Sequence, residues 1–387
     1  MDPVPTLAAS SSTGGAVDAT LDPSGLRVAI LSDAIPGRNG VGTYYDDLAA
    51  HLRPRVEELR LVTPPRDPEA SYGGLRFPLP GDETQALFVP WPWTLRRELT
   101  GLRPHVVLAA TPSAYGIAGM VLAHATGAGF CVGHHTQLDE LADLYWTSLF
   151  GRVTVAALGL WDRLVRRTDA TVLVHNAELV DELREGGTRD VRLMGTPTAP
   201  GFIDPPVRPL RPEANRVIFV GRLAPEKRVD QVLALARTRP DLHVRVVGDG
   251  PLRGEVDAAA ADLPNLEALP WVPRARVVEL LDDSDLLVLP SVYETFGTAA
   301  LEAMARGRIA VVSDRCGIGL WPELAPGLVR MAPEEPLVAA VDRVRSATPE
   351  ERAGRAATAR AAAEALTERT VEHWLSVLVG LAAATAA

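Results

Sequence analysis

The sequence predicts an α/β protein made of two doubly wound parallel sheets in tandem. Short β-branched runs alternate with helical stretches, which is typical of strands buried on both faces. The series restarts after a Pro-rich segment, residues 201–212. Both halves open alike, with Arg-Val-Ala-Ile-Leu at 27–31 and Arg-Val-Ile-Phe-Val at 216–220. Two such sheets facing one another would place a central ligand cleft at the carboxyl ends of their strands.

The individual strands are expected where β-branched and aliphatic residues cluster. In the first half they cover 27–32, 86–90, 105–110, 129–133 and 170–175. In the second half they cover 216–220, 243–247, 265–269, 285–289 and 309–313.

The domain organisation follows from length and composition. At 387 residues the chain exceeds what one hydrophobic core usually serves, so two domains are expected. The Ala-rich tail favours a helix, and Trp374 and its apolar neighbours would dock it on the first domain. We predict a flexible leader over 1–25, a first domain over 26–203, a second domain over 204–368 with the Pro-rich segment as hinge, and a terminal helix over 369–387.

Composition excludes several classes of protein. The net charge of −10 argues against a nucleic-acid partner, because polyanions are bound by clustered cations. Two cysteines far apart in the sequence, Cys131 and Cys316, do not make a disulfide framework and suit a reducing cytoplasm. The leader has no basic start and no apolar core, so it is not expected to be a signal peptide. A cytoplasmic protein is predicted.

Lysine occurs once, at Lys227, and every other one of the 39 basic residues is arginine. The lysine lies within Val-Gly-Arg-Leu-Ala-Pro-Glu-Lys-Arg-Val-Asp, residues 220–230. A compact ammonium and a planar guanidinium are not interchangeable at a site that binds an anion. This position is therefore predicted to require an ammonium group.

A second marked segment, residues 290–302, carries Glu294 and Glu302 eight residues apart across a Gly-containing turn. A strand pattern precedes this turn and a helical pattern follows it, so backbone amides at 296–298 should bind phosphate at a helix start. One carboxylate could then accept hydrogen bonds from a sugar and the other from a ribose diol. The alternative is an ordinary surface helix residue, Glu302, and an ordinary cap, Glu294.

Three segments in the second half together resemble a known enzyme family. Residues 220–230, Val-Gly-Asp-Gly-Pro at 247–251 and residues 290–302 are similar to the donor half of retaining GT-B glycosyltransferases of family 4, also called group 1. The first half resembles the family through Asn-Gly-Val-Gly-Thr at 39–43 and residues 133–140. The resemblance implies a GT-B fold with two Rossmann-like domains. It also implies transfer of a UDP- or GDP-linked sugar to a hydroxyl of a small molecule, lipid or glycoconjugate.

The resemblance implies a role for each matching residue. Arg222 and Lys227 would hold the diphosphate and offset the charge on the leaving nucleotide, while Glu294 would contact the sugar. His135 matches the histidine beside the anomeric centre, although His134 leaves the register ambiguous by one. The predicted catalytic residues are Glu294, Lys227, Arg222 and His135, and the predicted donor-binding residues are Gly40, Gly42, Val272, Ser291, Thr295, Phe296, Gly297, Thr298 and Glu302.

Two predictions about the first half have plain structural alternatives. Gly40 and Gly42 would let the backbone approach the diphosphate closely, or they belong to a simple strand-to-helix turn. Residues 144–167 combine aromatic bulk with a basic end, which suits either peripheral contact with the inner face of a membrane or a core helix with a basic last turn.

No metal or organic cofactor is expected. The adjacent pairs Asp46-Asp47 and Asp282-Asp283 resemble solvated helix positions and not an Asp-x-Asp metal motif. Nor is there a carboxylate pair of the glycosidase type, so the resemblance implies front-side attack on the anomeric carbon. Only Pro322 and Glu323 of the family pattern remain in residues 314–323, and the sequence therefore predicts a donor class and not one donor.

Two other functions fit parts of the sequence. A nucleotide-sugar-binding protein without turnover would keep the same fold, but the intact acid pair and Lys227 argue against it. A double Rossmann chain could also be a dehydrogenase. Residues 32–42 lack the Gly-x-Gly-x-x-Gly signature that a dinucleotide requires.

Overall fold

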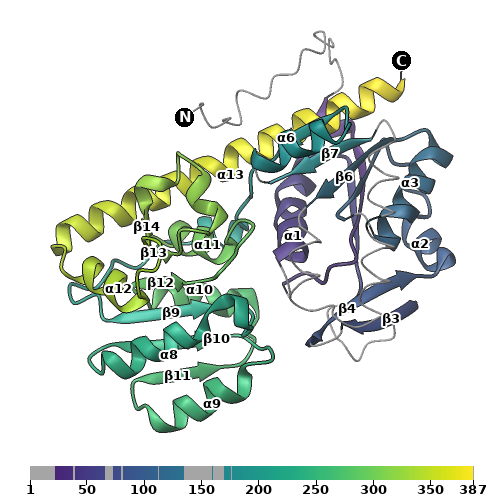
Figure 1. Ribbon diagram of the computed structural model, residues 1–387. Coiled ribbons are helices and arrows are strands. Elements are labelled where there is room, and N and C mark those ends of the chain that lie inside the picture. The colour runs from purple at the N-terminus through teal and green to yellow at the C-terminus, as the bar shows by residue number, and fades with distance from the viewer. Residues whose placement is uncertain are drawn as a thin grey trace. The chain divides into compact units, whose positions relative to one another are not determined.

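The computed structural model describes residues 22–37, 40–65, 73–79, 82–111, 113–134, 159, 170–175 and 177–386. The chain divides into two compact units, one of residues 1–197 with 368–387 and the other of residues 198–367 (Figure 1). Each unit is built on a six-stranded parallel sheet. The predicted fold class, α/β with two doubly wound sheets, is confirmed.

The first sheet has the strand order β2-β1-β5-β6-β7-β8. Chain order reverses between β1 and β5, and ligands of open α/β sheets bind beside such a switch point. The strands are β1 (Arg27–Leu31), β2 (Glu58–Val62), β5 (Val106–Ala109), β6 (Gly129–His134), β7 (Thr171–Val174) and β8 (Val191–Leu193). The described helices are α1 (Gly40–Leu52), α2 (Pro92–Leu99), α3 (Ala114–Thr126) and α6 (Ala177–Glu185), with 3-10 turns η1 (Pro23–Gly25) and η2 (Arg53–Arg55).

The second sheet has the order β11-β10-β9-β12-β13-β14, with its switch point between β9 and β12. The strands are β9 (Arg216–Val220), β10 (His243–Val247), β11 (Leu266–Leu269), β12 (Leu286–Leu289), β13 (Ile309–Val312) and β14 (Leu328–Arg330). The helices are α7 (Pro200–Ile203), α8 (Val229–Thr238), α9 (Arg253–Asp262), α10 (Arg274–Asp282), α11 (Thr298–Ala305), α12 (Leu337–Arg345) and α13 (Pro349–Ala386), with η3 (Pro225–Lys227), η4 (Gly317–Leu320) and η5 (Ala325–Gly327).

Residues 86–90 form a strand, as predicted, but this strand does not belong to the parallel sheet as expected. These residues belong to β4 (Asp82–Pro90), which pairs antiparallel with β3 (Gly74–Leu79) in a separate two-stranded sheet. The strands β2, β8 and β14 were not predicted, and each lies at an edge of its sheet. An edge strand such as β2, whose residues are mostly half-buried, lacks the continuous apolar run that marks a strand covered on both faces.

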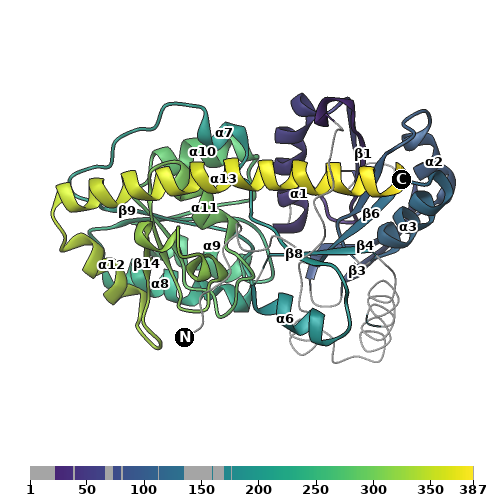
Figure 2. The ribbon, with the colours of Figure 1, turned by 90° about the horizontal axis from the view of Figure 1, so that it is seen from above.

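The first sheet is covered on both faces. Helix α1 packs on one face in a core that includes Tyr45 and Leu48, and α2 and α3 pack on the other in a core that includes Leu95 and Tyr115 (Figures 1 and 2). This double coverage explains why β1 and β5 read as unbroken apolar runs in the sequence.

The end of α13 belongs to the first of these cores. Trp374 is fully buried there and donates its indole N–H to the Tyr44 hydroxyl oxygen at 2.7 Å. The Tyr44 hydroxyl in turn donates to the Gly195 carbonyl at 2.9 Å. The indole therefore buries its apolar surface and satisfies its polar group, as a buried tryptophan requires.

The Pro-rich segment, residues 201–212, lies within the second unit, which begins at Thr198. Proline lacks an N–H group, so such a segment offers carbonyl acceptors but few donors. Arginines supply the donors. The fully buried Arg306 donates to the carbonyls of Phe202, Pro205 and Pro206 at 3.2, 2.8 and 2.7 Å, and Arg308 donates to that of Arg208.

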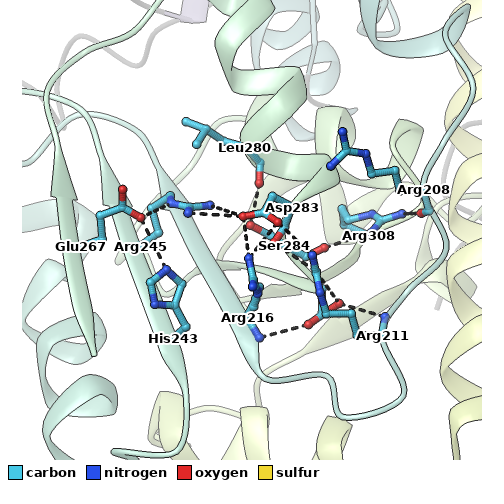
Figure 3. A network of polar contacts seen from close by, with 11 residues as sticks. Arg208, Arg211, Arg216, His243, Arg245, Glu267, Leu280, Asp283, Ser284 and Arg308 are labelled. Carbon is cyan, nitrogen blue, oxygen red and sulfur yellow. Dashed lines mark hydrogen bonds and ion pairs between the residues drawn. The ribbon is translucent and has the colours of Figure 1, made fainter. Parts of the chain in front are cut away.

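Figure 3 shows a network of arginines and acids at the amino ends of strands in the second sheet. Asp285, just before β12, accepts hydrogen bonds from the amides of Arg211 and Arg216 at 3.1 and 3.0 Å. Asp283 forms ion pairs with the same two arginines at 2.9 and 2.7 Å. The network ties the amino ends of these strands together, whereas ligands of open α/β sheets bind at the carboxyl edge.

Replacing Arg306 by Met should lower the free energy of unfolding by about 3–5 kcal/mol, because it strands the Asp282 carboxylate, which Arg306 contacts at 2.8 Å, and three backbone carbonyls. Urea unfolding measures the loss. Arg237, an exposed arginine on α8, is the matched control, and its Met variant should stay within about 0.5 kcal/mol of wild type. Equal stability of the two variants would contradict the role given to Arg306.

Candidate active site

The loops at the carboxyl ends of the second sheet are hydrogen-bonded to one another. The Leu223 amide, in the loop after β9, donates to the Asp249 carbonyl after β10 at 2.9 Å. The Asp249 side chain accepts from the Trp271 amide after β11 at 3.0 Å. The Val292 amide after β12 donates to the Glu226 carbonyl at 2.7 Å. Four successive loops therefore form one connected surface.

Two glycines of the Val-Gly-Asp-Gly-Pro segment make this contact possible. Gly248 and Gly250 have φ values of 143° and 151°, which residues with a side chain rarely adopt. A Cβ atom on Gly248 would lie 1.9 Å from the carbonyl oxygen of Gly221, and one on Gly250 would lie 2.5 Å from that of Leu223. The glycines therefore bring the β10 loop against the loop that carries Arg222 and Lys227.

Both cations named from the sequence have acidic partners. The Lys227 ammonium lies 2.6 Å from Glu294 Oε1, which also accepts a hydrogen bond from Ser291 Oγ at 3.2 Å. Arg222 pairs with Glu226, four residues further along the chain. The two cations and two carboxylates balance in charge, and all four side chains are largely shielded from solvent. Glu226 was missed in the sequence, although its spacing from Arg222 could have indicated it.

The Lys227–Glu294 contact spans the switch point. Lys227 ends η3 after β9, and Glu294 lies in the loop after β12, the neighbouring strand on the other side of the reversal. Residues 67 apart in sequence thus meet where an open α/β sheet binds its ligand.

Helix α11 begins directly beside this pair. Gly297, just before the helix, has φ of 97°, and a Cβ atom there would lie 2.7 Å from the Cys316 sulfur. The Phe296 carbonyl accepts from the Ile318 amide at 2.6 Å, and the Glu294 carbonyl accepts from the Gly317 amide at 2.9 Å. The loop after β13 therefore fixes where helix α11 starts. The first amides of this helix lack acceptors within the helix and suit an anion.

Glu302 lies one turn inside α11 and is nearly buried, with 6% of its surface exposed. Arg274, at the start of α10, contacts its carboxylate at 2.9 Å and stacks over the Phe202 ring at 4.9 Å. Burial raises the pKa of Glu302 above its ordinary value, while Arg274 acts in the opposite direction. Arg274 was not predicted from the sequence. Its position two residues after Val272 was the one available signal.

The remaining predicted donor residues of the second unit lie on the same loops. Ser291 is buried, Phe296 is buried against Trp321, and Val272, Thr295 and Thr298 are half-buried. Val272 precedes α10 and the others surround the start of α11. The structure thus gathers all the second-half residues named from the sequence at one edge of one sheet.

In the first unit, Gly40 and Gly42 form the first turn of α1. A Cβ atom on Gly42 would lie 2.3 Å from the Ile35 carbonyl oxygen, so the turn itself requires glycine there. No described atom lies within 4 Å of the corresponding point on Gly40, so the packing of the described residues does not itself require glycine there. His135 falls outside the described residues, as does 144–167 apart from residue 159.

Two family matches cover most of the chain. Residues 203–319 match the family described as "Glycosyl transferases group 1", and residues 38–195 match "Glycosyltransferase Family 4". The chain is a family 4 glycosyltransferase.

Sequence relatives of this glycosyltransferase are similar over most of its length. A GDP-mannose-dependent alpha-mannosyltransferase of Mycobacterium tuberculosis is 28% identical over 76% of the chain and 80% of that protein. The sulfoquinovosyl transferase SQD2 of Arabidopsis thaliana is 24% identical over 79% of the chain and 63% of that protein.

Solved structures show the same fold. A sucrose-phosphate synthase from Thermosynechococcus elongatus superposes with a TM-score of 0.69 at 15% identity, covering 91% of this chain and 98% of that one. HepE of Anabaena, solved with UDP-glucose, gives a TM-score of 0.62 at 15% identity over 91% of this chain and 99% of that one. The glycosyltransferase therefore has the GT-B fold, as its motifs predicted.

Replacing Arg274 by Met should destabilise this glycosyltransferase by about 3 kcal/mol at about pH 8, because it leaves a buried carboxylate unpaired. A carboxyl group whose pKa is raised by folding binds its proton more tightly in the folded state, so folding becomes less favourable as pH rises. The loss should therefore shrink as the pH falls and Glu302 takes up its proton. Urea unfolding at about pH 8 and at a lower pH measures this difference.

Two further variants control this experiment. Arg276→Met removes an exposed arginine from the same helix and should change little. Glu302→Gln combined with Arg274→Met should remove the pH dependence. If Arg274→Met lowers the free energy of unfolding equally at both pH values, the charge of Arg274 does not stabilise ionised Glu302.

Proposed function

We propose that this glycosyltransferase moves a sugar from a UDP- or GDP-linked donor to an acceptor hydroxyl with retention at the anomeric carbon. The observation that carries the proposal is the Lys227–Glu294 contact at the switch point, beside the start of α11. Two comparisons support a nucleotide-sugar donor: the name of the mannosyltransferase relative specifies GDP-mannose, and HepE was solved with UDP-glucose.

In this proposal the ion pairs exchange partners when the donor binds. The diphosphate takes Lys227 from Glu294 and Arg222 from Glu226, and the first amides of α11 add further donors. Glu294, released from the ammonium, accepts hydrogen bonds from the sugar hydroxyls. The cations then meet the charge that grows on the leaving phosphate, where preorganised donors accelerate reaction most. This arrangement calls for no metal or organic cofactor.

Glu302 is proposed to accept hydrogen bonds from the ribose diol. Arg274 keeps its carboxylate ionised and oriented, and an ionised carboxylate is the stronger acceptor. Val272 and Ser291 are proposed to contact the base, and Thr295, Phe296, Gly297 and Thr298 the phosphates and sugar. Gly40 is proposed to give the diphosphate close backbone contact.

Retention is proposed to occur by front-side attack. The sequence shows no carboxylate pair of the glycosidase type, and in this proposal Glu294 is engaged with the sugar hydroxyls and Glu302 with the ribose diol. The departing phosphate would take the proton of the acceptor hydroxyl, and His135, by resemblance to the family, would lie beside the anomeric centre.

The acceptor is proposed to bind to the first unit and to be a small molecule, lipid or glycoconjugate. A cytoplasmic location belongs to the same proposal and is supported by two free, buried cysteines, Cys131 and Cys316. None of the described helices is long and apolar enough to cross a bilayer. No group of three or more His, Cys, Asp or Glu residues in the described segments is placed to hold a metal ion.

The alternative, a binding protein without turnover, predicts donor binding but no reaction. Incubating the purified chain with a panel of UDP- and GDP-sugars and measuring release of the nucleoside diphosphate distinguishes the two. Release that depends on added acceptor supports the enzyme. Stabilisation by donor without any release supports the binding protein.

Replacing Lys227 by Ala should lower turnover by on the order of a hundredfold or more, because it removes a donor aimed at the leaving phosphate. Steady-state release of nucleoside diphosphate measures the effect. Arg237→Ala, which removes an exposed cation from the next helix, should keep wild-type turnover. A folded Lys227→Ala variant with near-normal turnover would rule out this role.

Replacing Glu302 by Gln should weaken binding of the preferred nucleoside diphosphate by roughly tenfold, because a charged acceptor for the ribose diol is lost. Isothermal titration calorimetry measures the affinity. The 2′,3′-dideoxy analogue lacks both hydroxyls, so wild type and variant should bind it equally. A similar loss for both nucleotides would show that Glu302 acts on the fold and not on the ribose.

A further inference from the structure

Four of the six exposed large apolar side chains described in the first unit lie on one short stretch of chain, and the other two, Ile117 and Val121, lie on α3. In the described residues, Leu75, Phe77, Trp91 and Trp93 are 43%, 40%, 36% and 66% exposed. Single exposed apolar residues are common on protein surfaces, but a contiguous group usually marks an interaction site.

The strand register places the first three of these side chains on one face. In the β3–β4 hairpin Leu75 lies opposite Val89, and side chains alternate between faces along a strand. Leu75, Phe77 and Val89 therefore share a face, and Trp91 continues it just beyond β4. The opposite face carries Phe88, which is buried in the core under α2 and α3.

The two tryptophans extend this face onto helix α2. Their rings stack with centroids 5.1 Å apart and planes 10° from parallel. Trp93, Arg96 and Arg97 follow the i, i+3, i+4 spacing of one helix side, and all three are exposed. The buried Leu95 and Leu99 anchor the other side of α2. Arg97 has one acidic neighbour, Glu98, at 3.4 Å on the exposed surface.

The support beneath this surface is fixed. The Trp91 amide donates to the Gly73 carbonyl at 2.9 Å, which ties the end of β4 to the start of β3. A Cβ atom on Gly73 would lie 2.4 Å from the Thr94 hydroxyl oxygen, so the hairpin packs directly on α2. The aromatic rings and the arginines are therefore presented together.

We propose that the surface formed by Leu75, Phe77, Trp91, Trp93, Arg96 and Arg97 binds anionic lipid membranes. Tryptophan favours the headgroup region of a bilayer, aliphatic and phenyl groups enter its apolar boundary, and arginine pairs with lipid phosphate. The whole chain has a net charge of −10, so attraction to an anionic bilayer must come from local cations within about 10 Å.

Lipid fits this surface better than a carbohydrate. Sugar hydroxyls both donate and accept hydrogen bonds, whereas the six side chains of this surface are aliphatic, aromatic or cationic and offer no carboxylate or amide acceptor. The proposal does not depend on the donor site, which lies in the other unit.

The test is co-sedimentation of the full chain with phosphatidylcholine vesicles, with and without phosphatidylglycerol. Wild type should bind the anionic vesicles more tightly. Trp93→Ser should weaken that binding by on the order of tenfold, because an exposed ring no longer enters the interface. Arg96→Glu with Arg97→Glu should weaken it by a similar factor or more and remove the preference for phosphatidylglycerol.

The control is a charge-matched double variant, Arg237→Glu with Arg276→Glu, which removes two exposed arginines of the second unit and should bind vesicles as wild type does. Stabilisation by UDP or GDP should be equal in every variant, which separates this result from the donor site. Wild type that sediments with neither vesicle, or Trp93→Ser that binds like wild type, overturns the proposal. The proposal is also overturned if the variants lose self-association, or show a raised KM for the acceptor, while the wild type binds no vesicles.

Discussion

The ion pair between Lys227 and Glu294 is the contact on which the carboxyl edge of the second sheet depends. It joins the loops after β9 and β12, the two central strands between which chain order reverses. The neighbouring loops are then crowded against these two. That crowding requires glycine at 248, 250 and 297, where a side chain would collide with backbone or with Cys316. This charged contact, the backbone hydrogen bonds between the loops and the three glycines together set the geometry of the edge.

The two kinds of cation do different work in this chain. Arg306 and Arg308 use the many donors of a guanidinium to satisfy carbonyls of a Pro-rich segment that cannot bond to itself. The single ammonium lies at the switch point against a carboxylate. A guanidinium suits a fixed, many-partner contact, whereas an ammonium is a compact charge that can change partner. This difference fits the presence of the single ammonium at Lys227.

Buried charge at the carboxyl edge of the second sheet is tolerated because it is paired. Glu302 lies in surroundings that favour its protonated form, and Arg274 counters this tendency. Glu294 and Glu226 likewise have cations beside them. Each pair costs desolvation that an apolar substitute would avoid, so the pairs are better explained by ligand chemistry than by stability. At the amino edge of the same sheet, by contrast, the ion pairs of Asp283 tie the strand ends together.

The sequence alone determined the fold class, the central strands and the second-half residues that meet at one edge. These are readable because doubly buried strands are continuously apolar and because motif residues after parallel strands must share an edge. Only the tertiary structure decided that Lys227 pairs with Glu294 and Arg274 with Glu302, and that residues 86–90 belong to an antiparallel hairpin. Such pairings join residues such as 274 and 302 or 227 and 294, and no local periodicity encodes a contact made across a sheet.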